Sequence, residues 1–350
     1  MKNVTIAVDA MGGDFGVKVT LPAVLHALDT YPELHIILVG KELILKSRLR
    51  GRLRKYGERL RIHHADEVVG MDELPSKALR GKKKSSMRLA INLVHEGVAG
   101  ACVSAGNTGA LMATARFVLK TLPGVDRPAI VARIPSGNKQ GYVRMLDLGA
   151  NVDCTPEHLQ QFAVMGSILA KDTDDMKKPR VALLNIGSEE IKGNELVRQT
   201  NDLLLETKGI NYVGFVEGND IFGDKADVIV CDGFTGNVVL KVMEGEARTI
   251  RDQIRRALTR SFFTKIGALF ILPALHEVRK RMSPARYNGA SLLGLRGIVI
   301  KSHGNTTPKG FFKAIERAYA EVARDVPKHI SSRVHELLEL SKKVDASAEE

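Results

Sequence analysis

Short apolar runs rich in β-branched residues alternate with segments of helical periodicity along most of the chain. Several runs, such as VALLNI and VIVC, are apolar almost throughout, which is typical of strands covered on both faces. The runs predict ten strands, at 4–10, 35–39, 61–64, 101–104, 129–134, 143–148, 181–186, 211–216, 228–231 and 297–300.

Between many of these strands lie amphipathic segments whose apolar residues recur every three or four positions. They predict helices at 17–28, 86–94, 108–119, 156–170, 189–205 and 235–258. The alternation of strands and helices predicts an α/β fold, an α/β/α sandwich with a mainly parallel sheet. Because no linker rich in Pro, Gly or Ser divides the chain, we expect a single domain over 1–350. Within it we expect a protruding helical hairpin at 245–286 and C-terminal helices at 308–344, split near Pro327.

Composition narrows the class of protein. Of the 350 residues, 44% are apolar and 26% charged, which excludes a disordered, collagenous or coiled-coil chain. Aromatic residues are sparse and Trp is absent, so we expect no single-stranded nucleic acid as partner. Three distant cysteines, Cys102, Cys154 and Cys231, predict no disulfide framework or zinc site. With no signal-peptide pattern and no spanning apolar run, the expected location is the cytoplasm.

The charge is +12 at pH 7 and is unevenly distributed. Residues 46–61 contain eight Lys and Arg against one acidic residue, Glu58, and residues 251–286 contain nine against two. Such basic segments attract nucleic acid, anionic lipid, phosphorylated substrates or acidic proteins. Alternatively, each of the two basic segments is a solvated surface that binds no partner.

Glycine clusters follow several predicted strands, at AMGGDFG (10–16), SAGNTGA (104–110), DLGAN (147–151), NIGSEEIKGN (185–194) and CDGFTGN (231–237). Glycine lets the backbone approach an anion, and the following helix N-terminus supplies N–H donors. Because ligands bind at the carboxyl ends of parallel strands, we expect these loops to share one edge and one phosphate pocket. Each loop taken singly is also compatible with an ordinary strand-to-helix turn.

The usual nucleotide and hydrolase motifs are absent from the sequence, including G-x-G-x-x-G, the P-loop and G-x-S-x-G. Polar residues in the glycine loops are therefore the candidates. Lys192, about one turn into the predicted helix, either reaches a phosphate or oxyanion or pairs with Glu189 or Glu195. Asn237 either orients a ligand or caps a helix.

The same alternatives apply to Asn107 and Thr108. For His303, a structural role stands beside a binding role. The residues expected to bind phosphate or the acyl thioester are Gly12, Gly13, Asp14, Asn107, Thr108, Gly109, Ser188, Gly236 and His303.

Taken together, the motifs are recognisable: AVDAMGGD (7–14), SAGNTGALMA (104–113), DLGANVDCTPEHLQQFA (147–163), LLNIGSEEIKGNE (183–195), VGFVEGNDI (213–221), DVIVCDGFTGNVVLK (227–241) and LLG…HG (292–304). In this order they resemble the bacterial phosphate acyltransferase family, also called acyl-ACP:phosphate transacylases, over about residues 4–325. The resemblance implies a fold related to phosphotransacetylases and isocitrate/isopropylmalate dehydrogenases, and a homodimer.

It also implies an activity. Inorganic phosphate attacks the thioester of a long-chain acyl carrier protein, giving acyl phosphate for phospholipid synthesis. Lys192 and Asn237 match the residues that the family associates with catalysis. We expect direct transfer without an acyl-enzyme, a metal or another cofactor.

The segment FFTKIGALFILPAL (262–275) is apolar, too short to span a bilayer, and flanked by cations. We expect contacts to an anionic membrane surface or the carrier protein from Arg256, Arg260, Lys265, Leu269, Phe270, Arg279 and Lys280. Burial at a dimer interface is the alternative. The expected behaviour is reversible membrane association.

Three other functions remain open at this level. A phosphotransacetylase acting on short acyl-CoA shares the anion pocket. A dehydrogenase of the related fold would use the loop aspartates Asp9, Asp14, Asp153 and Asp232 as metal ligands. A non-enzymatic membrane-binding protein would use only the hairpin.

Overall fold

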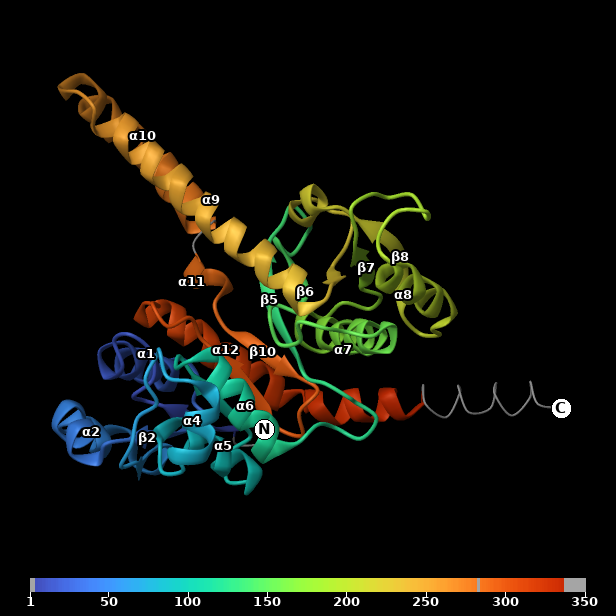
Figure 1. Cartoon of the computed structure of the whole chain (residues 1–350). Helices are drawn as coiled ribbons and strands as arrows, with labels where there is room; N and C mark the ends of the chain where they lie inside the picture. Colours follow the sequence, from blue (N-terminus) through green and yellow to red (C-terminus); the bar gives the residue numbers. More distant parts are fainter. Residues whose placement is uncertain (1–3, 282–283, 337–350) are drawn as a thin grey trace.

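In a computed structural model, which describes residues 4–281 and 284–336, eleven strands form one sheet in the order β3-β2-β1-β4-β11-β10-β5-β6-β9-β7-β8 (Figure 1). The strands are β1 (Val4–Asp9), β2 (Leu34–Gly40), β3 (Leu60–His64), β4 (Ala101–Ser104), β5 (Ala129–Pro135), β6 (Tyr142–Leu146), β7 (Arg180–Leu184), β8 (Asn211–Val216), β9 (Val228–Val230), β10 (Ala290–Leu293) and β11 (Ile298–Lys301). All ten predicted strands are present, with ends shifted by at most two residues. The sequence prediction missed β10, a four-residue strand.

Most strand pairs are parallel, which confirms the predicted fold class, but the sheet contains two parallel blocks that run in opposite directions. One block is β3-β2-β1-β4-β11 and the other is β6-β9-β7-β8. Between them, β10 and β5 make three antiparallel pairings, so the direction is reversed across the centre. The prediction that all five glycine loops follow strands at one edge is therefore wrong.

The helices are α1 (Val17–Thr30), α2 (Glu42–Leu49), α3 (Arg52–Tyr56), α4 (Pro75–Gly81), α5 (Ser86–His95), α6 (Thr108–Leu119), α7 (Pro156–Asp174), α8 (Glu195–Glu206), α9 (Gly233–Thr259), α10 (Phe262–Arg281), α11 (Pro284–Tyr287) and α12 (Pro308–Ala323). The six helices predicted from periodicity are present. One begins later than expected, because Asn194 caps α8 by accepting a hydrogen bond from the Val197 N–H at 3.0 Å.

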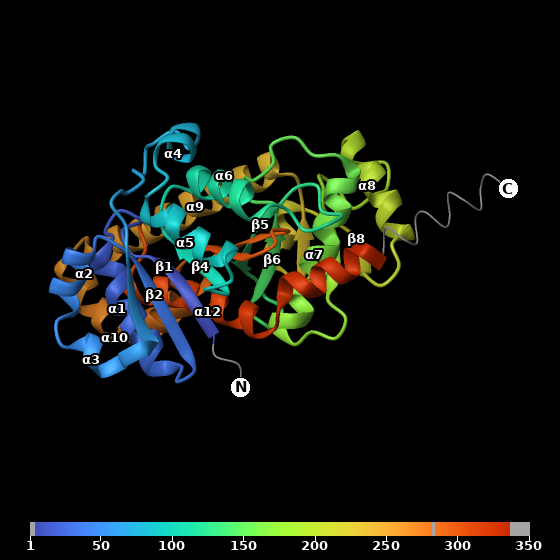
Figure 2. The ribbon, with the colours of Figure 1, turned by 90° about the horizontal axis from the view of Figure 1, so that it is seen from below.

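Helices cover both faces of the sheet, as the apolar strands require. Neighbouring residues of one strand enter different apolar clusters: Ala7 packs with α5 and α6, whereas Ile6 and Val8 pack with α1 and α12. At the other end, Val228 and Val230 pack with α7. Figure 2 shows α1 and α2 beside the first block and α7 and α8 beside the second. One apolar cluster contains residues of both blocks.

Helices α9 and α10 pack against each other and form a hairpin that projects from the body of the molecule (Figure 1). The chain direction changes by 120° between α9 and Phe262–Ala274. Among the described residues, no single helix has the length and hydropathy to cross a bilayer; only this bent pair, counted together, meets that test.

The chain is helical at its C-terminal side over the described residues. After α12 the chain breaks at Arg324 and Asp325 and is helical again over 326–336. The predicted continuation to 344 lies outside the described residues.

The start of α9 lies against the loop that follows β6, with backbone packed on backbone. The Gly233 N–H donates to the Asn151 oxygen at 2.8 Å, and a Cβ at Gly236 would lie 1.9 Å from the Asp147 oxygen. No side chain fits at position 236 without displacing the helix. Gly245, about two and a half turns later in the same helix, has open space around it.

We therefore expect opposite effects from alanine at the two glycines. Gly236→Ala should lower the free energy of unfolding by about 2 kcal/mol, because the new methyl group overlaps a main-chain oxygen. Gly245→Ala should raise it by up to about 1 kcal/mol, because alanine has the higher helix propensity. Denaturant unfolding of both variants measures this. Equal effects would show that the close approach at Gly236 is unimportant.

Candidate active site

The first loop group comprises the loops after β1, β4 and β11. A buried carboxylate holds it together: Asp9 accepts hydrogen bonds from the N–H groups of Met11 and Gly12, at 3.2 and 3.1 Å, and from the Ser104 hydroxyl at 2.7 Å. Burial raises the pKa of the Asp9 carboxyl, while these hydrogen bonds oppose the rise. A Cβ at Gly12 would lie 2.5 Å from Asp9 Oδ2 and 2.8 Å from the Gly106 nitrogen, so the first two loops touch.

The third loop joins them through main-chain contacts. The Asp14 N–H donates to the Gly304 oxygen at 3.1 Å. The predicted residues Gly12, Gly13, Asp14 and His303 therefore lie in one neighbourhood. Asp14 and His303 are both exposed.

Asn107 acts as the N-cap of α6. Its Oδ1 accepts the Ala110 N–H at 2.9 Å, and its Nδ2 donates to the main-chain oxygens of Met71 and Glu73 at 2.7 and 3.2 Å. The Asn107 amide thus makes its hydrogen bonds within the protein. Of the two roles considered for Asn107, the structure shows the helix cap. Thr108 is exposed in the first turn of α6, and Gly109 lies against Pro75.

Lys301, at the end of β11, is a cation buried beneath the first loop group. Its ammonium donates to the main-chain oxygens of Ala105 and Ser302. Burial lowers its pKa to about 8, opposed by the nearby negative charges of Asp14 and Asp9.

The second loop group comprises the loops after β6, β9 and β7. Asp147, fully buried, has the same role as Asp9. Its carboxylate accepts N–H groups of Ile130, Ala150 and Asn151 at 3.1, 2.9 and 2.8 Å, and the Asn151 side-chain amide at 2.8 Å. Burial raises the pKa of the Asp147 carboxyl.

Asn237 lies one turn into α9, next to Gly149: a Cβ at Gly149 would be 3.4 Å from the Asn237 Cβ. The cap of this helix is Asp232, which accepts the Thr235 N–H at 2.8 Å. Asn237 is therefore not the cap. Its side chain is exposed, and no residue in the described part of the chain hydrogen-bonds with it, so its amide is available to a ligand.

Lys192 follows β7, but its predicted place inside a helix is wrong. It ends a turn in which its N–H donates to the Glu189 oxygen at 3.0 Å, and α8 starts only at Glu195. The stem of Lys192 lies over Gly187, where a Cβ would be 2.9 Å from its Cγ. Its ammonium has no partner among the described residues, so the alternative of a lysine paired with Glu189 or Glu195 does not hold. Ser188 is exposed in the same loop.

The loops of Lys192 and Asn237 are neighbours. Because β7 and β9 are adjacent parallel strands, paired from Val181↔Val228 to Leu183↔Val230, their carboxyl ends lie side by side. The structure thus brings Ser188, Lys192, Gly236 and Asn237 to one edge.

Helix α9 also connects the two loop groups. Glu244 Oε1 lies 3.6 Å from His303 Nε2, and Lys241 is close enough to Lys301 to influence its charge. Asn237, Lys241 and Glu244 follow a spacing of four and three and share one helix face. Along α9, Asn237 is about 10 Å from the contact with His303. The candidate site therefore extends along this face between the two loop groups.

Four contributors were missed by sequence reasoning: Asp147, Lys241, Glu244 and Lys301. Asp147 and Lys301 lie at the ends of predicted strands. A charged residue at such a position could have indicated a part of the site. The sequence could not predict that Lys241 and Glu244 belong to the site. They lie near Lys301 and His303 only because α9 runs past the first loop group. In the described part of the chain, no three His, Cys, Asp or Glu side chains are grouped to hold a metal ion.

The chain is similar to proteins of one family over most of its length. A family model described as fatty acid synthesis protein matches residues 4–329. A phosphate acyltransferase of Coxiella burnetii (strain Dugway 5J108-111) is 56% identical, covering 95% of this chain and 97% of its own. That of Methylococcus capsulatus is also 56% identical, with coverages of 94% and 96%. That of Legionella pneumophila (strain Paris) is 52% identical, with coverages of 97% and 98%.

Solved structures show the same fold at low identity. A phosphotransacetylase from Streptococcus pyogenes has a TM-score of 0.59 at 17% identity, over 92% of this chain and 94% of that one. The EutD phosphotransacetylase from Staphylococcus aureus gives 0.54 at 17%, over 91% and 94%. The chain has the fold of these proteins and is an enzyme of the fatty acid synthesis protein family. Within it, the chain belongs to the phosphate acyltransferases.

The buried lysine generates a pH-dependent prediction. Lys301 releases its proton near pH 8 in the folded state and near 10.5 when unfolded. Between these values the unfolded chain binds more protons, so stability should rise with pH. Relative to Lys301→Met, the wild type should gain about 2 kcal/mol of unfolding free energy between pH 7 and 10. Denaturant unfolding across this range tests it. A constant difference would contradict the buried position of this ammonium.

Proposed function

We propose that this enzyme transfers a long-chain fatty acyl group from acyl carrier protein to inorganic phosphate, giving acyl phosphate for phospholipid synthesis. Membership of the phosphate acyltransferase family supports acyl transfer to phosphate. The observation that carries the proposal is the pair of exposed polar side chains without protein partners, Lys192 and Asn237, on loops of adjacent strands.

In this mechanism a phosphate oxygen attacks the thioester carbonyl, the carbon–sulfur bond breaks, and the carrier thiol leaves with a proton. Phosphate is a competent nucleophile at neutral pH, so the enzyme needs mainly to orient it and to stabilise the developing oxyanion. Lys192 screens and positions the phosphate. Asn237, with Lys192, donates to the carbonyl oxygen.

We infer direct transfer rather than an acyl-enzyme. Cys154, in the loop after β6, has a pKa raised to about 11 by burial. Burial also raises the pKa values of Cys102 and Cys231. The reactive thiolate form is therefore scarce at all three positions.

Removal of either polar group should slow turnover strongly. Lys192→Ala should lower kcat by two to three orders of magnitude, because one lost oxyanion donor costs about 3 kcal/mol of barrier. Asn237→Ala should act in the same direction. The assay measures phosphate-dependent release of carrier thiol from long-chain acyl carrier protein with labelled phosphate. Glu190→Ala, an exposed residue of the same loop, is the control.

The same assay separates the alternatives. Equal turnover of long-chain acyl-CoA and acyl carrier protein would favour a phosphotransacetylase. An obligatory divalent ion would favour the dehydrogenase alternative. An acylated Ser or Cys trapped during turnover would overturn direct transfer.

We further propose a homodimer in the cytoplasm that associates reversibly with anionic membranes through the hairpin. Phe263 and Phe270 are more than four-fifths exposed, and Leu269 is 65% exposed. The cations Arg256, Arg260 and Lys265 flank them, all exposed. Arg279 and Lys280 lie in α10, but their side chains are outside the described part. An apolar tip with a cationic border suits an anionic lipid surface.

The double variant Leu269→Glu, Phe270→Glu should release the protein from vesicles that contain anionic phospholipid, because two charges replace apolar contacts. Sedimentation with the vesicles measures binding. Leu205→Glu, Val213→Glu adds the same charge at exposed positions of the body and should bind as the wild type does. If the hairpin variant still sediments with the vesicles, the tip is not the attachment site.

A further inference from the structure

The second strongly charged surface of the molecule is not used by the proposed function. It is the arginine patch, formed by Arg48, Arg50, Arg52 and Arg54 of α2, α3 and the turn between them. We propose that the arginine patch docks the acidic protein that delivers the acyl thioester. This inference rests on the proposed function, because it assumes a carrier-bound donor.

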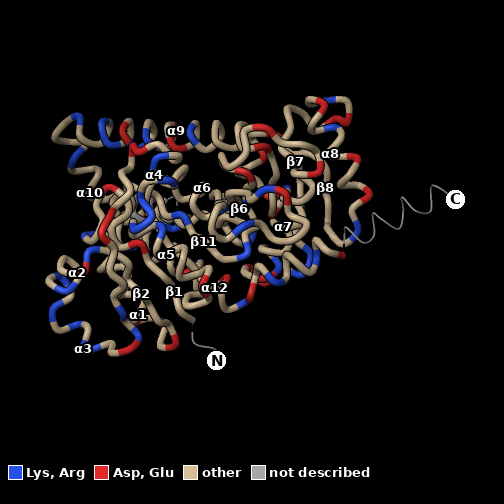
Figure 3. The backbone as a smooth tube through the Cα atoms, turned by 60° about the horizontal axis from the view of Figure 1, so that its bottom comes forward, with Lys and Arg blue, Asp and Glu red and all other residues tan. Residues whose placement is uncertain are grey.

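The cations of this surface fall into two sets. Lys46 pairs with Glu42 at 2.6 Å and Lys55 with Asp29 at 2.8 Å, while Arg59 donates to three main-chain oxygens, those of Leu28, Tyr31 and Leu34. The side chains of the four arginines of the patch are exposed and have no ion pair or hydrogen bond with any described residue. Between residues 41 and 61 there are nine Lys and Arg and only two acidic residues. Lys41 and Arg61 also have no ion pair with a described residue, but the four arginines lie closest together along the chain. Figure 3 shows the Lys and Arg positions along α2 and α3.

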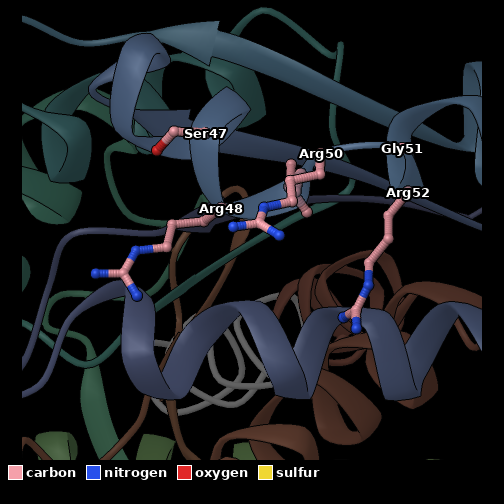
Figure 4. A pocket seen from close by; sticks show the side chains of 6 residues that line it. Ser47, Arg48, Arg50, Gly51 and Arg52 are labelled. Carbon is pink, nitrogen blue, oxygen red and sulfur yellow. The ribbon is translucent and has the colours of Figure 1, made fainter.

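The patch is concave. A hollow of about 510 Å³ is lined by Ser47, Arg48, Leu49, Arg50, Gly51 and Arg52. In Figure 4 the side chains of Arg48, Arg50 and Arg52 extend to one side of the turn. Planar guanidinium groups bind carboxylates through two parallel hydrogen bonds, so a set of them around a hollow fits protruding Asp and Glu side chains.

Arg50 adds a second observation. It occupies a left-handed backbone conformation, φ 45°, directly before Gly51, whose φ of −70° suits any residue. Positive φ is unfavourable for a residue with a side chain, and glycine would adopt it freely. Arginine is thus less favourable than glycine for the backbone conformation at position 50. A role of its side chain in binding would explain why the turn contains arginine there.

The patch is also close to the candidate site. Helix α2 starts directly after β2, and Gly40 at the end of β2 lies against Met11 of the first loop group. Since α2 has eight residues, the patch is about 12 Å along that helix. A carrier bound there would lie beside the first loop group, at one end of the candidate site that extends along α9.

A protein suits this surface better than lipid. Next to the arginines, Leu43 is 84% exposed and Ile44 is 37% exposed, which provides a small apolar contact. Arginine around a limited apolar centre is typical of protein interfaces. The large exposed apolar residues that a membrane requires are on α10 instead.

The test compares two acyl donors. The triple variant Arg48→Glu, Arg50→Glu, Arg52→Glu should lower kcat/KM for long-chain acyl carrier protein by about thirty-fold or more at low salt. With the same acyl group on pantetheine, without the carrier, kcat/KM should stay within about twofold of the wild type. The matched control is Lys177→Glu, Lys178→Glu, Lys208→Glu, which changes the net charge equally at exposed positions in the other half of the molecule. It should behave as the wild type with both donors.

Arg50→Gly is a second variant, and it removes no side-chain hydrogen bond or ion pair within the described residues. It relieves the backbone conformation, so its thermal unfolding midpoint should equal or exceed that of the wild type, while kcat/KM for the carrier-bound donor falls. If the triple variant loses both donors equally, or neither, the docking proposal is wrong. If it instead loses only binding to anionic vesicles, the patch contacts lipid. If the wild type does not use the carrier-bound donor at all, the proposed function itself has failed.

Discussion

The close contact between the start of α9 and the loop after β6 is the constraint on which the site depends. Gly233 and Gly236 let the helix backbone touch the oxygens of Asn151 and Asp147. That contact determines where Asn237 lies, and through the path of the helix it also determines where Lys241 and Glu244 meet the first loop group. One helix thus joins two parallel blocks whose carboxyl ends point in opposite directions.

The two loop groups use the same device. Asp9 at the end of β1 and Asp147 after β6 are both fully buried, and each accepts main-chain N–H groups from the glycine-containing turn that follows it. A buried carboxylate that accepts several N–H groups organises a turn without needing a counter-ion. The polar groups of these two turns are thus satisfied within the fold, whereas the exposed side chains of Lys192 and Asn237 have no partner among the described residues.

Local patterns were sufficient to predict the strands and the amphipathic helices, because burial on both faces makes VALLNI or VIVC unmistakable. The direction of the second block could not be predicted, since it depends on β10, four residues whose pairing with β5 and β11 leaves no local pattern. Lys192 was placed in a helix because Glu189 and Glu190 resemble a first helical turn, whereas Asn194 supplies the actual cap. Lys241 and Glu244 resembled a solvated helix face, and only the path of α9 shows their place near His303.

The continuity of α9 has a structural consequence. Its first turn carries Asn237 and its far end leads into the exposed apolar residues of α10, with no break in the helix between Gly233 and Thr259. The exposed apolar residues at the far end of the hairpin and the amide at position 237 therefore share one structural support, so the proposed membrane contact and the candidate site are parts of the same continuous hairpin.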